Sequence, residues 1–172
     1  LLSKILIWES FNTDMKKLIL LFLLIPTISF SAGDRIEETI NEYINQNPNW
    51  ADWMKNDSSI AFLSTRCAAN FRLVAGRAAN ANLNEAEKFD LYHEIFLRLG
   101  GMLSQANGIS TDNFIAKYEY WIDTYLNEGK DNMKKFNTFV DGKFAEDFDS
   151  CGKRVLPVVN NIIDVVSKNM NN

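Results

Sequence analysis

Apolar residues recur every three or four positions along most of the chain after residue 33, which is the spacing of amphipathic helices. Residues that cap or interrupt helices separate these periodic segments. Five helices are therefore predicted, over residues 34–46, 58–80, 85–106, 110–129 and 155–166. Helical spacing also continues from Met133 to Phe148, with a break expected at Asp141 and Gly142.

Two of these segments carry features that predict how they pack. In 58–80, Cys67 belongs to an apolar stripe and is expected to face the core, together with Ile60, Leu63, Phe71, Val74 and Ala78. In 85–106, Gly100 and Gly101 interrupt a strong apolar pattern, and each should weaken the helix by roughly 1 kcal/mol relative to alanine. A kink or a close helix crossing at these glycines is the expected compensation.

The last apolar segment, Val155–Val166, has two interpretations. Its valines and isoleucines would also suit a strand, whereas Pro157 fits the first turn of a helix. No second segment could pair with such a strand, and an isolated strand is not stable, so a helix is predicted. The pattern as a whole predicts one all-α domain, a bundle of about four main helices with a short N-terminal helix alongside.

The start of the chain has the three-part plan of a secretory signal peptide. The basic tip Met15–Lys17 precedes the apolar run Leu18–Ile25, and small residues at Ser29 and Ser31 favour cleavage after Ser31 or Ala32. An uncleaved membrane anchor is the alternative, but a spanning helix needs roughly 20 apolar residues, more than this stretch supplies. We therefore assign residues 1–14 to upstream translation, 15–32 to the signal peptide and 33–172 to the exported domain.

The two cysteines, Cys67 and Cys151, both follow the predicted signal peptide. In an oxidising compartment such a pair predicts a disulfide, here between the second helix and the start of the last one; two free buried thiols are the alternative. The bond would close a loop of about 85 residues, to which the chain-entropy model assigns roughly 4–5 kcal/mol of stabilisation. No Cys-x-x-Cys redox pair is present, and no cysteine follows the signal peptide closely enough to carry a lipid.

Composition narrows the classes of function. Apolar residues make up 47% of the 172-residue chain, as in globular proteins, and the formal net charge of −4 argues against binding to nucleic acid. A single histidine leaves little room for a histidine-rich metal site or a Ser-His-Asp triad. No glycine-rich phosphate loop or nucleophile elbow is present, so no cofactor is predicted.

Three residues of the second helix form a narrow polar strip: Arg66, Asn70 and Arg77. Two guanidinium groups beside an amide could bind a carboxylate or phosphate. The alternative is that the arginines form ion pairs with the abundant acidic residues of this chain.

Aromatic residues mark a second candidate surface. Trp50 and Trp53, followed by Met54, could form an exposed patch for a partner, a lipid or a sugar, or could instead cover the open end of the bundle. Tyr120 projects off the core face of the fourth helix and is the other aromatic residue expected at the surface.

Two further features resemble metal sites only weakly. His93, at the edge of an apolar helix face, could ligate a metal or haem together with Met102 or Met133, but a histidine at the boundary of the core explains it as well. The segment Asp147–Gly152 begins like a calcium loop, but it lacks the acidic ligand at the twelfth position. We interpret it as a solvated acidic turn.

Three functions remain open from the sequence. The first is a small exported protein, periplasmic or secreted, that acts without catalysis by binding an unknown protein or small molecule, with no stable membrane insertion after cleavage. The second is an enzyme of hydrolase type built from Arg66, Arg77, His93 and carboxylates that folding brings together. The third is a structural or assembly subunit.

Overall fold

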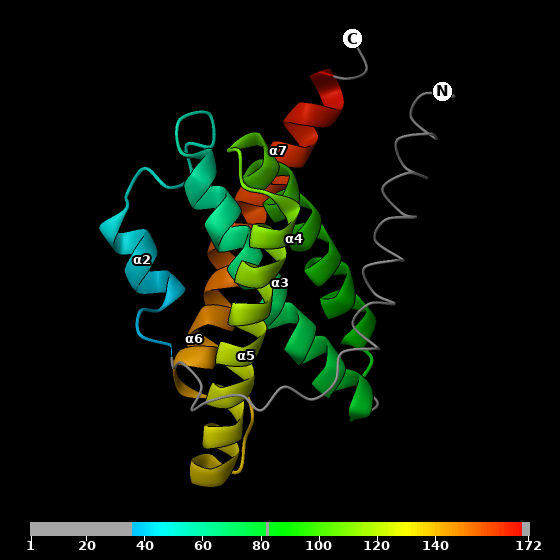
Figure 1. Ribbon diagram of the computed structural model, residues 1–172. Helices are drawn as coiled ribbons and strands as arrows, with labels where there is room; N and C mark the ends of the chain where they lie inside the picture. The colour runs from blue at the N-terminus through cyan, green and yellow to red at the C-terminus, as the bar shows by residue number, and fades with distance from the viewer. Residues whose placement is uncertain (1–35, 82, 170–172) are drawn as a thin grey trace. The chain divides into compact units, whose positions relative to one another are not determined.

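The computed structural model describes residues 36–81 and 83–169, and this part of the chain consists of helices joined by short turns, with no strand (Figure 1). The predicted all-α bundle is confirmed. The helices are α2 (Ile40–Gln46), α3 (Asp57–Asn80), α4 (Ala86–Ala106), α5 (Thr111–Phe136), α6 (Gly142–Ser150) and α7 (Leu156–Asn169), with a short π-helical segment, Cys151–Val155, between the last two.

Helix α3 is the centre of the bundle and contacts α4, α5, α6 and the π-helical segment. Its small side chains, among them the fully buried Ala68 and Ala69, let neighbouring helices approach closely. The expected close crossing at the paired glycines of α4 is confirmed, because a Cβ added to Gly100 would lie 3.0 Å from Oγ1 of Thr65. The conformational cost of a glycine within α4 is therefore offset by helix packing.

The predicted disulfide is present between Cys67 of α3 and Cys151, the first residue of the π-helical segment. The two Cα atoms lie 5.5 Å apart, and neither side chain is exposed to solvent. The bond joins the central helix to the junction of α6 and α7, as the sequence pattern predicted.

Helices α6 and α7 form one continuous helical run through the π-helical turn. Pro157 has no N–H to donate, and the chain accommodates it by widening the preceding turn, where the Leu156 N–H bonds to the Cys151 carbonyl. The helical interpretation of the last apolar segment is confirmed, with the proline in the first turn of α7.

Two helix boundaries differ from those predicted. Gly129 does not end α5, which continues to Phe136 and stops at Asn137 in a left-handed conformation. Gly129 instead leaves room for the ring of Phe139, which a Cβ would contact. The first helix begins at Ile40 rather than at residue 34, since Thr39 caps it in a reciprocal capping box with Glu42.

No helix in the described part of the chain is long and apolar enough to cross a membrane. The predicted signal peptide and the residues assigned to upstream translation lie outside the described residues.

Candidate functional site

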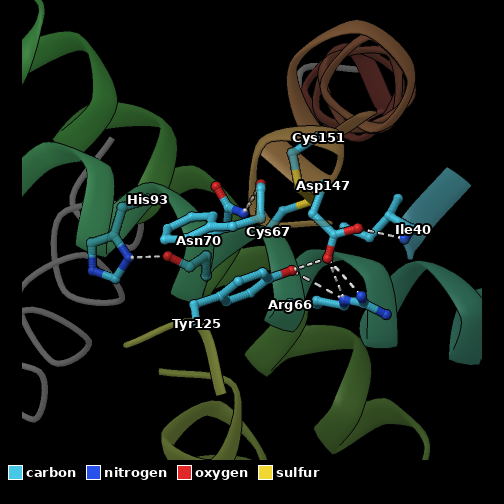
Figure 2. The surroundings of a disulfide bond; sticks show 10 residues. Ile40, Arg66, Cys67, Asn70, His93, Tyr125, Asp147 and Cys151 are labelled. Carbon is cyan, nitrogen blue, oxygen red and sulfur yellow. Dashed lines mark hydrogen bonds and ion pairs between the residues drawn. A yellow bond between two sulfur atoms is a disulfide. The ribbon is translucent and has the colours of Figure 1, made fainter. Parts of the chain in front are cut away.

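Arg66, Tyr125 and Asp147 form a buried polar cluster beside the disulfide, with one residue from each of α3, α5 and α6 (Figure 2). The Arg66 guanidinium donates to Oδ2 of Asp147 from Nε (3.0 Å) and from Nη2 (2.5 Å). The Tyr125 hydroxyl donates to the same oxygen at 2.5 Å and accepts from Arg66 Nε at 3.1 Å. No side chain of the cluster is more than 1% exposed.

Side chains of the cluster also bind backbone groups of residues 36–40, which we call the leading segment. Oδ1 of Asp147 accepts from the Ile40 N–H at 2.6 Å, and Nη2 of Arg66 donates to the Glu38 carbonyl at 2.5 Å. Lys143 of α6 adds bonds from its Nζ to the carbonyls of Ile36 (2.9 Å) and Glu37 (2.7 Å). The Ile40 N–H at the start of α2 and the carbonyls of residues 36–38 just before it are thus paired by side chains of α3 and α6.

The protonation states of the cluster follow from its burial. Burial and the neighbouring Asp147 charge raise the pKa of the Tyr125 hydroxyl well above its ordinary value, so this group is a neutral donor. Burial also raises the pKa of the Asp147 carboxyl, although Arg66 and the hydrogen bonds that the carboxyl accepts act in the opposite direction. An arginine remains protonated in proteins, so the pair unites opposite charges inside the core.

The interpretation of Asp147–Gly152 as a solvated acidic turn is wrong. This segment spans the end of α6 and the start of the π-helical turn, and Asp147 is fully buried. Asp147 lies one helical turn after the buried Phe144, on the face of α6 that packs on α3, where Arg66 compensates its charge. Asp149, on the other side of the helix, is the solvated acid and pairs with Lys153.

The polar strip predicted on α3 does not form one surface. Arg66 forms the ion pair that was the alternative to anion binding, and Asn70 is fully buried, with its amide 3.5 Å from the Phe144 carbonyl. Arg77 lies outside the core, with its guanidinium 4.1 Å from the centre of the Phe139 ring.

The tryptophans after α2 are largely covered. Trp50 belongs to the core, and Trp53 packs against it half-buried, while Met54 is 75% exposed. Tyr120 is exposed as expected and makes an edge contact with the Trp121 ring. Trp50, Trp53 and Tyr120 therefore do not all face solvent.

His93 faces the core of the bundle. Its Nδ1 lies 3.1 Å from the Ala68 carbonyl, and its ring stacks on Tyr118. Among the residues that the structure describes, no group of three or more histidine, cysteine or acidic side chains is placed to hold a metal ion. Arg66, Arg77 and His93 have separate partners: Arg66 pairs with Asp147, His93 bonds with the Ala68 carbonyl, and Arg77 lies over the Phe139 ring.

A hollow of about 140 Å³ lies among α3, α4 and α5, and its wall is mostly apolar. Two aromatic rings, Phe62 and Trp121, form part of this wall in an edge-on contact with centroids 5.9 Å apart. The Arg66 guanidinium lies 4.2 Å from the centre of the Trp121 ring, which connects the hollow to the buried cluster. The lining residues are Ser58, Ala61, Phe62, Thr65, Ser104, Asn107, Ile109, Lys117 and Trp121.

The sequence did not single out this hollow, because its residues come from three helices and a turn. A partial signal was present, since Ser58, Phe62 and Thr65 share one face of α3, and Lys117 and Trp121 lie four residues apart on α5. Periodicity assigns such residues to the core or its edge, but it does not show where three helices leave space.

The buried His93 predicts a pH dependence of stability. Burial lowers the pKa of His93, although its hydrogen bond with Ala68 opposes the shift. The unfolded chain takes up a proton near pH 6.5 while the folded protein resists it, so stability is complete above about pH 6.5 and falls below it. We expect the midpoint of thermal unfolding to decrease between about pH 7.5 and 5.5, and to decrease less in His93→Asn.

The asparagine amide preserves a donor for the Ala68 carbonyl and does not titrate, and the chain holds no other histidine. The difference between the two proteins therefore isolates this group. Equal pH dependence in both would contradict a buried neutral imidazole.

Comparison with known proteins supplies no identity for this arrangement. No protein-family model matches the sequence, and neither curated proteins nor solved structures give a significant match. Any proposal for function therefore comes from the geometry of the helices themselves.

Proposed function

We propose that this protein is a non-catalytic binding protein of an exported compartment, and that its ligand site is the hollow among α3, α4 and α5. The hollow is the observation that carries the proposal, because it combines aromatic walls with a few polar groups, as ligand pockets do. Arg66, Tyr125, Asp147 and His93 make their hydrogen bonds inside the core and do not line the hollow. Because these four polar side chains are not available to a ligand in the hollow, we favour binding over catalysis as the function of the site.

The size of the hollow limits its occupant. Pockets for whole drug-sized ligands measure about 300–1,000 Å³, whereas a cavity of about 150 Å³ takes one benzene molecule. At about 140 Å³ the hollow suits one ring-sized apolar group. We infer that the ligand is either a small ring compound or a larger molecule that inserts one such group.

The wall of the hollow is held in place before any ligand arrives. Trp121 contacts the Arg66 guanidinium on its face, and it also contacts the rings of Phe62, Tyr120 and Tyr125. A side chain fixed by so many neighbours loses little conformational freedom on binding, and preorganisation of this kind favours affinity.

The exported location is supported by the pattern of residues 15–32 and by the disulfide, since such bonds persist in oxidising compartments. Intact-mass measurement on protein from its native host tests this part of the proposal. We expect a chain that begins after Ser31 or Ala32 and that gains the mass of two hydrogen atoms on reduction. A chain that retains residues 15–32 and gains no mass would contradict export.

Substitutions that fill the hollow with a larger side chain are expected to abolish the binding of small ring compounds. In the wild-type chain, phenol should cause saturable NMR shifts at the Trp121 indole and the other lining residues. Ala61→Leu places a branched side chain in the hollow and should abolish these shifts, whereas Ala79→Leu, on the exposed face of the same helix, should leave them unchanged.

Ala61 is itself buried, so Ser58→Leu at the exposed rim provides a second filling variant that leaves the core intact. Loss of the shifts in either folded filling variant supports the site. Shifts that persist in both, or that are absent from the wild type, would overturn it.

A further inference from the structure

We propose that the hollow selects an apolar ring that carries a carboxylate, and this inference rests on the binding function proposed above. Among the residues that the structure describes, the lining includes one cationic side chain, Lys117, and no aspartate or glutamate. This is notable in a chain whose acidic residues outnumber its basic ones by 22 to 18. The charge at the hollow therefore has the opposite sign to that of the whole molecule.

Lys117 is available to a ligand. Its side chain is exposed at the hollow and forms no ion pair or hydrogen bond with the described residues. By contrast, Lys55, Lys134 and Lys153 each pair with an acid on their own segment. An unpaired ammonium beside an apolar space is placed to bind an anion whose remaining atoms enter that space.

Ser104 of α4 also lines the hollow and supplies a second donor. Only 4% of this residue is exposed, yet its hydroxyl makes no hydrogen bond within the described structure. The Thr65 hydroxyl, in contrast, already donates to the Ala61 carbonyl at 2.7 Å. A carboxylate accepts hydrogen bonds and has none to donate, so it can use both Lys117 and Ser104.

Helix dipoles do not decide the sign of the charge that the hollow prefers. The first turn of α3 and the last turn of α4 both border it, through Ser58 and Ser104, and their partial charges are opposite. The full charge of Lys117 therefore sets the preference for an anion.

Two sources could present this chemistry: a free aryl acid, or the C-terminal residue of a peptide that ends in phenylalanine. Isothermal titration of the full-length chain with phenylacetate and its neutral amide, phenylacetamide, tests the carboxylate directly. The peptide Gly-Gly-Gly-Phe, with a free or an amidated C-terminus, tests the second source. Whichever of phenylacetate and the peptide with a free C-terminus has the lower dissociation constant identifies the source that the hollow prefers.

We expect each carboxylate form to bind at least about tenfold more tightly than its amide, as a charge-assisted hydrogen bond allows. Lys117→Met should remove this difference in affinity without weakening the binding of phenylacetamide. Ser104→Ala should reduce the difference. Lys135→Met, in the last turn of the same helix, removes the same charge away from the hollow and should have no effect.

The outcomes separate this inference from the binding function. If the acid and the amide bind equally well, the carboxylate preference is overturned while the hollow remains a binding site. If the acid binds more tightly but Lys117→Met does not change the ratio, the role of Lys117 is overturned. If no probe binds to the wild type, both proposals are overturned.

Discussion

The ion pair between Arg66 and Asp147 is the interaction on which the arrangement of the helices depends. Two charges leave water only when each finds partners, and here the same pair also binds Tyr125 and the backbone of residues 38 and 40. Four elements, α2, α3, α5 and α6, therefore converge on one buried point. Removal of one partner from such a pair typically costs about 3–5 kcal/mol, against a total stability of about 5–15 kcal/mol.

The disulfide and the ion pair connect nearly the same positions by different physical means. Cys67 follows Arg66 directly in α3, and Cys151 lies one turn after Asp147. The covalent bond acts mainly by restricting the unfolded chain, whereas the ion pair specifies which groups meet in the folded one. Arg66 also supports Trp121, so the same buried charge that orders the core shapes the wall of the hollow.

The helices were predictable because periodicity is a local property, and the disulfide was predictable because two cysteines allow a single pairing. The buried ion pair was not, since arginine and aspartate are ordinarily solvent-exposed and their burial depends on a partner 81 residues away. The prediction that Gly129 ends a helix was wrong, because the sequence does not reveal the Phe139 ring that occupies the space beside this glycine. Of the candidate site residues, Arg66 was predicted to lie in a polar strip and His93 at the edge of an apolar helix face, but the burial of both is a tertiary property.

Hydrogen exchange at the Ile40 amide tests the central claim most directly. This amide is at the first position of α2, where no carbonyl within the helix can accept from it, and it is held by Asp147 alone. The account predicts that it exchanges as slowly as the core amides of α3 in the wild type, and rapidly in Asp147→Asn. Rapid exchange of the Ile40 amide in the wild type would show that the buried ion pair does not hold the leading segment.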